Sequence, residues 1–295
     1  MNNKKIIILL DGYSYIYRFY FVALKNQNIE NTIYLFFYTI QNILKTYLPK
    51  KFIVIFDSKE KNFRTKIFQK YKKNRKKIPF ELIQIINTIY KILIHLGIPT
   101  LCIPNVEADD VIATISKLAE KNGDITLIGT IDKDLTQLVN KNIYILNKNH
   151  YNISSSVDIK KKYGVHPKYI IDLFALIGDQ SDNIPGVKGI GKKTAIKLIL
   201  SIGSINQIYK NLKKIHTLPL KGKKNILKKL IEGKNMAILS YKLIKLKINV
   251  DIKKKYTEIT FQKNNNYLKP YNIKYFKMMH NIYYLIQNIC KYHKI

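Results

Sequence analysis

Residues 52–57 have the sequence Phe-Ile-Val-Ile-Phe-Asp, a short apolar run rich in β-branched residues that ends on an acid. A continuous run of this kind is typical of a parallel strand covered on both faces. Residues 6–10, 125–128 and 143–146 share this character. Helical patterns lie between the runs, one from Pro79 to His95 and another from near Ala108 to Gly123. The alternation predicts an α/β fold with a central, mostly parallel sheet flanked by helices.

The second half of the chain differs. From Val165 onward, short helical segments are broken by glycines, and no convincing strand follows until about residues 257–261. We therefore expect an α/β core over residues 1–165 and a helical subdomain over residues 166–276. Residues 277–295 are a Tyr- and Lys-rich tail, expected to form a terminal helix without visible chemistry.

The composition is strongly basic, with 52 Lys and Arg against 19 Asp and Glu and a net charge of +33. Such a charge favours a polyanionic partner, with nucleic acid ahead of an anionic membrane surface. Part of the excess reflects the Lys, Ile, Asn and Tyr usage expected of an AT-rich genome, so charge is supporting evidence only. Cys102 and Cys290 match no metal-site spacing, and no run of about 18 apolar residues is present. We expect a reduced, cytoplasmic protein that does not act at a membrane.

Acids concentrate where strands and helices meet. Asp11 and Asp57 end the first two predicted strands, and Asp132 and Asp134 follow a third. Parallel strands deliver their carboxyl ends to one edge of a sheet, where ligands bind. The remaining candidates begin a helix or lie in a turn, which helix capping and Asx turns also explain: Glu107, Asp109, Asp110, Asp179 and Asp182. These carboxylates would repel one another without cations, and oxygen-only ligands select Mg²⁺ or Mn²⁺. Two such ions about 4 Å apart can promote phosphodiester hydrolysis.

Two basic features flank this edge. Residues 59–77 carry ten Lys or Arg with interleaved aromatics, which suits phosphates and unpaired bases, although a solvated basic helix is the plainer interpretation. Residues 186–194, Gly-Val-Lys-Gly-Ile-Gly-Lys-Lys-Thr, nearly match a phosphate-binding P-loop. Lys193 stands where that motif needs Ser or Thr, and the run follows a proline turn and not a strand. A helix-hairpin-helix that holds the duplex backbone fits better.

These motifs together resemble the 5′-3′ exonuclease / flap endonuclease family, with particular likeness to the N-terminal exonuclease domain of bacterial DNA polymerase I. The resemblance covers about residues 4–276, and its main stretches are 11–18, 56–64, 71–75, 106–110, 132–134 and 178–195. It implies a PIN-like α/β core, a helical arch after Asp57 and a two-metal site. The implied metal ligands are Asp11, Asp57, Glu107, Asp109, Asp110, Asp132, Asp134, Asp179 and Asp182, with Mg²⁺ as the ion and Mn²⁺ as a substitute.

The resemblance also assigns roles to basic residues. Lys72 and Arg75 would engage the scissile phosphate, and together with Asp11 and Asp134 they are the expected catalytic residues. If the segment is helical, they lie three positions apart on one face, away from Lys76. The hairpin would hold duplex DNA and K⁺. The expected DNA contacts are Arg18, Arg64, Tyr71, Gly186, Lys188, Gly189, Gly191, Lys192, Lys193 and Thr194.

The expected activity is hydrolysis of DNA and RNA-primer phosphodiesters near 5′ flaps, nicks and free 5′ ends. The protein would work beside a DNA polymerase and a ligase, as a stand-alone nuclease. The alternative is a DNA-junction binding protein whose catalysis has decayed, which the intact carboxylate set argues against. Three departures from the family pattern, Phe21, Asn105 and Ile131, bear on rate and not on reaction class.

Overall fold

The computed structural model describes residues 5–75, 77–146, 152–262 and 276–295. One sheet has the strand order β3-β2-β1-β4-β5-β6. The strands are β1 (Ile6–Asp11), β2 (Lys51–Phe56), β3 (Thr100–Cys102), β4 (Ile125–Gly129), β5 (Ile143–Leu146) and β6 (Ile153–Ser154). All neighbouring pairs are parallel except β5 with β6, which is antiparallel. The mostly parallel sheet and its four predicted strands are confirmed. The short strands β3 and β6 were not expected.

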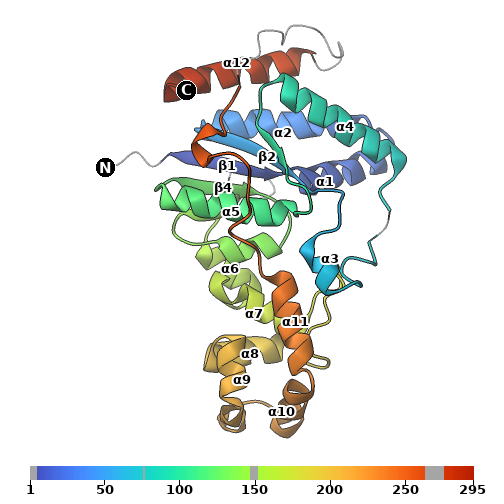
Figure 1. The fold of residues 1–295 in the computed structure, drawn as a ribbon, viewed down its shortest axis with the longest axis vertical. Coiled ribbons are helices and arrows are strands. Elements are labelled where there is room, and N and C mark those ends of the chain that lie inside the picture. Colours follow the sequence, from blue (N-terminus) through green and yellow to red (C-terminus); the bar gives the residue numbers. More distant parts are fainter. Residues whose placement is uncertain (1–4, 76, 147–151, 263–275) are drawn as a thin grey trace.

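Helices cover both faces of the sheet (Figure 1). Ile8 and Leu10 of β1 face one layer, and Ile7 and Leu9 face the other. The first layer is formed by α1 (Gly12–Lys25), α2 (Asn31–Tyr47) and α4 (Phe80–His95), and α12 (Phe276–His293) packs on the outer side of α2. The second contains α5 (Ala108–Lys121) and the 3₁₀ helix η1 (Asp134–Leu138). Burial on both faces explains why the strands are uninterrupted apolar runs. The predicted helices at 79–95 and 108–123 and the terminal helix are present.

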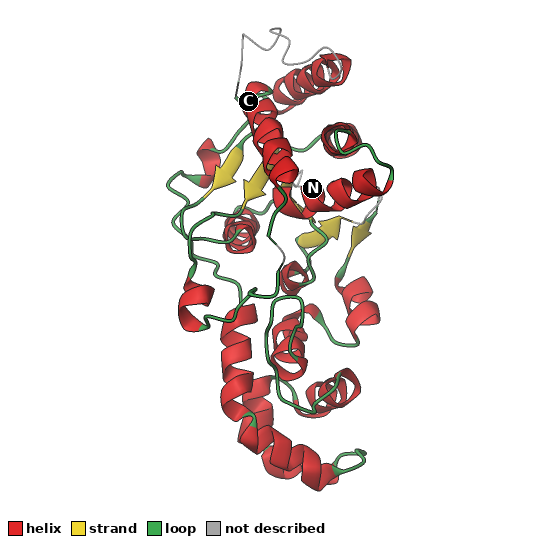
Figure 2. Ribbon diagram, turned by 90° about the vertical axis from the view of Figure 1, so that its right-hand side faces the viewer, coloured by secondary structure: helices red, strands yellow, loops and turns green. Residues whose placement is uncertain are grey.

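Residues 156–244 extend away from the sheet as a helical end, which the described residues build from helices and loops (Figures 1 and 2). Its elements are α6 (Ser156–Tyr163), η2 (Pro167–Tyr169), α7 (Ile170–Ile177), α8 (Lys192–Ile202), α9 (Ile205–Lys210), η3 (Leu212–Thr217), α10 (Lys223–Glu232) and α11 (Lys234–Ile244). These helices share one apolar core with α5, so their position relative to the sheet is fixed by packing. None of the helices among the described residues is both long and apolar enough to cross a membrane.

The strand expected over 257–261 is wrong. The chain there forms a 3₁₀ turn, η4 (Tyr256–Glu258), and continues without pairing as a strand. Buried Lys51 donates from Nζ to the carbonyls of Thr257 and Ile259, at 3.2 and 2.7 Å. Those carbonyls are therefore satisfied by a side chain from β2 and not by a neighbouring strand.

The helical arch expected after Asp57 is also wrong over the described residues. The segment has one short helix, α3 (Phe63–Ile67), and then turns up to Arg75. Lys72 has a left-handed backbone with φ of +55°, and its N–H donates to Asp182 O at 3.0 Å. A left-handed residue cannot continue an α-helix, so Lys72 and Arg75 do not lie on one helical face. Lys76 lies outside the described residues.

Candidate active site at the carboxyl edge of the sheet

Three strands bring acids to one edge, and each acid also organises the backbone beyond its strand. Asp11 accepts the Ser14 N–H and the Thr130 hydroxyl, both at 3.0 Å, so it caps α1 and binds the loop after β4. Asp57 accepts the Ala108 N–H at 2.7 Å and thereby caps α5. Asp132 accepts the Asp134 N–H at 2.9 Å. These hydrogen bonds use only one or two of the lone pairs of each carboxylate. Capping therefore explains only in part why an acid stands at each of these positions.

Burial and mutual repulsion raise the pKa values of several acids at this edge of the sheet. Burial raises the pKa of Asp11 to about 7, and the charge of Asp57 adds to the rise. Burial likewise raises the pKa of Asp132, and it raises that of Asp109 well above its ordinary value with help from Asp132 and Asp11. The pKa of Asp134 is also raised well above its ordinary value, chiefly by burial and then by the charges of Asp132 and Asp182. Acids that repel one another in this way form a site for positive charge.

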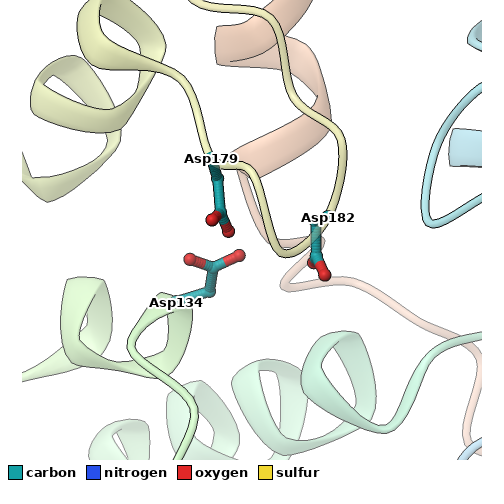
Figure 3. A group of neighbouring side chains, drawn as sticks. All are labelled: Asp134, Asp179 and Asp182. Atoms are coloured by element: carbon teal, nitrogen blue, oxygen red, sulfur yellow. The ribbon is translucent and has the colours of Figure 1, made fainter. Parts of the chain in front are cut away.

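A compact cluster of three buried acids stands out. Asp134, Asp179 and Asp182 each present an oxygen within 4.8 Å of the others. Figure 3 shows the carboxylates of Asp134 and Asp179 turned toward each other, with Asp182 beside them on the loop that follows α7. Asp134 Oδ1 is buried and lacks a hydrogen-bond partner among the described residues. An unpartnered buried carboxylate oxygen and an all-oxygen donor set fit a hard divalent cation.

Cations of the chain itself lie against the acids. Lys72 Nζ is 2.8 Å from Glu107 and 3.9 Å from Asp182, and Arg75 pairs with Asp182 at 2.5 Å. Burial alone would lower the pKa of Lys72, but neighbouring groups, chiefly Glu107, raise it well above its usual value. Both residues therefore remain charged, and both lie at the acidic edge in turns; their expected role at the scissile phosphate stays a prediction.

Lys133 is a functional candidate that the sequence reasoning missed. Its Nζ is 2.6 Å from Asp179 Oδ1 and lies 4.9 Å from the centroid of the Phe174 ring. A signal was available, because this lysine stands between the two acids of Asp-Lys-Asp at residues 132–134. It adds a third positive charge to the edge of the cluster.

Arg64 and Tyr71 are not on the surface, so their expected DNA contacts are wrong in this conformation. Arg64 is 1% exposed and binds Glu107 and both oxygens of Asp110, at 2.7–2.8 Å. Tyr71 is buried and its hydroxyl donates to Glu107 at 3.3 Å. Arg64 also donates to both oxygens of Asp110, so Asp110 is paired with an arginine in this conformation, and its expected role as a metal ligand stays a prediction.

Glu107 is also engaged by the protein. Its two oxygens accept from Asn62, Lys72, Arg64 and Tyr71. Burial raises its pKa on its own, but Lys72 and Arg64 outweigh burial and leave the pKa below its ordinary value. Glu107 is therefore ionised and connects the basic segment to the start of α5.

The hairpin between α7 and α8 presents most of its predicted contact residues to solvent. Lys188, Gly189, Gly191, Lys192 and Lys193 are exposed, Thr194 is half-buried, and the two lysines begin α8. Gly186 is different, because it is buried and its N–H donates to Ser240 Oγ at 3.0 Å. A Cβ there would lie 2.3 Å from Gly178 N. Gly186 is thus required by packing, and the expected DNA contact by it is wrong.

The remaining predicted positions lie around α1 and the nearby loops. Arg18 is half-buried in α1, with its guanidinium 5.6 Å from the Phe19 ring centroid. Phe21 and Ile131 are about half exposed, at 55% and 49%. Asn105 has a left-handed backbone, with φ of +62°. The three-acid cluster includes none of the three departures from the family pattern, Phe21, Asn105 and Ile131.

Two family models match nearly the whole chain. The 5′-3′ exonuclease N-terminal resolvase-like domain matches residues 6–164, and the 5′-3′ exonuclease C-terminal SAM fold matches residues 165–267. A 5′-3′ exonuclease of Buchnera aphidicola subsp. Schizaphis graminum is 46% identical over 265 residues, which span 88% of this chain and 92% of that protein. DNA polymerase I of Pseudomonas aeruginosa is 35% identical over 83% of this chain, which corresponds to 28% of the polymerase.

Solved structures show the same fold at low identity. A T5 5′-exonuclease with bound divalent metal ions (zinc) has a TM-score of 0.69 and 21% identity, covering 98% of this chain and 100% of that one. The catalytic core of Rad2 in complex with DNA substrate has a TM-score of 0.58 and 21% identity, covering 88% and 83%.

Proposed function

The chain belongs to the 5′-3′ exonuclease family, and from this membership we propose that it is a metal-dependent nuclease that hydrolyses DNA phosphodiesters near 5′ ends. It acts as a 5′-3′ exonuclease and as a structure-specific flap endonuclease. The observation that carries the proposal is the buried cluster of Asp134, Asp179 and Asp182 with its unpartnered oxygen. A buried carboxylate oxygen without a hydrogen-bond partner is unfavourable unless a cation binds it, which supports a metal ion at this cluster.

Two divalent ions complete the proposed site, with Mg²⁺ as the natural ion and Mn²⁺ as a substitute. The three-acid cluster holds one ion, and Asp11, Asp57, Asp109 and Asp132 hold the other, since their charges act on one another. When bound, such ions make an attacking water more acidic and stabilise the leaving oxygen. The role of K⁺ at the hairpin rests on the resemblance alone.

The side chains of the protein have separate tasks. Lys72 and Arg75 lie against Glu107 and Asp182 at the acidic edge, where they neutralise the charge that builds on the non-bridging phosphate oxygens. The exposed lysines at 188, 192 and 193 bind the backbone of the duplex at the start of α8. The hairpin binds the phosphate backbone and makes no contact with base edges, so the enzyme recognises the shape of its substrate and not its sequence.

The proposed substrates are 5′ flaps, nicks, free 5′ ends and RNA primers. Their removal leaves a nick with a 5′ phosphate, so the enzyme follows a DNA polymerase and precedes a ligase, in the cytoplasm. These roles rest on the family and on the basic composition of the chain, whose net charge is +33.

The test is cleavage of a 5′-labelled flap and a 5′-labelled nicked duplex, with Mg²⁺, with Mn²⁺ and with excess chelator. We expect short 5′ products only when a divalent ion is present, and none from Asp134→Asn protein. Cleavage in chelator, or no cleavage with any divalent ion, would overturn the proposal.

A further inference from the structure

Arg64 connects three parts of the chain through a fully used guanidinium group. Nε donates to Leu243 O at 2.7 Å, Nη1 to Glu107 and Asp110 at 2.7 Å, and Nη2 to Asp110 at 2.8 Å and Lys245 O at 3.3 Å. These five bonds use all five N–H groups that an arginine carries. Arg64 itself lies in α3, its acids lie at the start of α5, and its carbonyls lie at the end of α11.

The connection extends toward the DNA-binding hairpin. α11 packs against α7, and Ser240 of α11 accepts the N–H of Gly186 in the loop between α7 and α8. On the other side of Arg64, Asp110 accepts the Lys247 N–H at 2.8 Å, which ties the chain after α11 to α5. The helical end therefore meets the carboxylate edge at a buried, hydrogen-bonded junction.

The same junction reaches a group that the proposed chemistry uses. One oxygen of Glu107 is held by Arg64, and the other accepts Lys72 Nζ at 2.8 Å. Tyr71 donates to Glu107 as well, and the Lys72 N–H binds Asp182 O. The position of the Lys72 ammonium group thus depends on Glu107, and the position of Glu107 depends on Arg64.

We propose that Arg64 is a positioning residue: through Glu107 it sets the place of Lys72, and through α11 it couples that place to the hairpin. The proposal rests on the proposed function for its kinetic readout but not for its chemical one. Asp110 serves as the second anchor of Arg64. Arg64 touches no reacting atom itself.

The kinetic test is a double-mutant cycle of Arg64→Lys with Lys72→Met, measured as single-turnover flap cleavage at saturating enzyme. Lysine keeps the charge but cannot reproduce the five-donor fork. We expect Arg64→Lys to lower the rate about 10–100-fold, as is usual for residues that orient a functional group. In the Lys72→Met background the same change should cost less than about 3-fold, because its target is gone. Effects that multiply fully, or an unchanged rate in folded Arg64→Lys protein, would overturn the proposal.

A second readout needs no cleavage. Modification of Lys72 by an amine-reactive reagent, followed by mass spectrometry of its peptide, should be several-fold faster in Arg64→Lys protein than in the parent. Unchanged labelling would overturn the positioning role even if the protein proved to have another activity. If Arg64→Lys protein does not fold, both measurements are made on Asp110→Asn protein instead. The control is Lys117→Gln, which removes a surface ion pair of the same helix, α5, and should change neither readout.

Discussion

Replacing Asp11 with asparagine should make the metal-free protein more stable at neutral pH while it abolishes cleavage. Asp11 is buried, and its pKa is raised from 3.8 to about 7, chiefly by burial and then by Asp57. An acid whose pKa is raised on folding holds its proton more tightly in the folded state. Its contribution to stability is therefore greatest below pH 3.8 and is lost as the pH rises through about 7. Asparagine never ionises and avoids that loss.

The magnitude follows from the shift. Each pKa unit corresponds to about 1.4 kcal/mol, so a rise from 3.8 to about 7 corresponds to about 4 kcal/mol. That figure is a ceiling for one substitution, because neighbouring acids take up part of the proton binding. Asparagine can keep the bond from Ser14 through its carbonyl oxygen, and its amide can donate to the Thr130 hydroxyl. We expect Asp11→Asn to be about 2–4 kcal/mol more stable than the parent at pH 8.

The assay is urea unfolding followed by circular dichroism, in chelator, for parent and variant from pH 4 to pH 8. The difference in unfolding free energy between Asp11→Asn and the parent should increase as the pH rises to about 7 and then stay constant. Mg²⁺ should stabilise the parent more than the variant, since binding to the folded state adds to stability. The control, Asp251→Asn, changes an exposed acid that accepts the Lys253 N–H, and its unfolding free energy should follow that of the parent at every pH. A difference that is absent at pH 8, or that does not vary with pH, would refute the electrostatic reasoning.

Three further predictions concern catalysis and binding. Asp134→Asn should abolish turnover yet leave duplex affinity equal or tighter in fluorescence anisotropy, because it removes a negative charge near phosphates; weaker binding by folded protein would count against it. Lys72→Ala and Arg75→Ala should each lower the single-turnover rate by about 10²–10³, whereas Lys73→Ala, an exposed neighbour, should mainly raise the dissociation constant. Similar rates for all three would make them interchangeable. Finally, log affinity should fall with log salt by about 0.9 per neutralised phosphate, and a flat line would mean that the +33 charge is not directed at DNA.

The sheet was predictable because its strands are buried on both faces. Runs such as 6–10 and 125–128 are apolar without interruption, which leaves few alternatives to a covered parallel strand. β3 and β6 have three and two residues, so they carry no periodic signal. The mistaken strand at 257–261 has an apolar pattern, but its carbonyls are bound by Lys51, about two hundred residues earlier in the chain.

The candidate site was predictable in its acids and less so in its cations. Asp11 and Asp57 end strands, a feature that sequence reports directly. Whether a basic residue faces solvent or an acid is decided by contacts that are distant in sequence. Arg64 is buried where it meets Asp110 and the end of α11, and Lys72 has a left-handed backbone in a turn where its N–H donates to Asp182 O. Neither partner can be identified from the composition of the basic segment.

The loop between α7 and α8 carries two acids of the cluster near its start, and Lys188, one of the lysines proposed to bind the duplex, lies near its end. Asp182 and Lys188 are separated by a short stretch in which Gly186 is fixed against Ser240. In the proposed enzyme this loop fixes the spacing between the duplex-binding surface and the metal site. The distance between the gripped duplex and the cut bond is set by the length of the loop and not by base sequence. The enzyme would thus cut at a constant offset from the junction, whatever the sequence of the strand it removes.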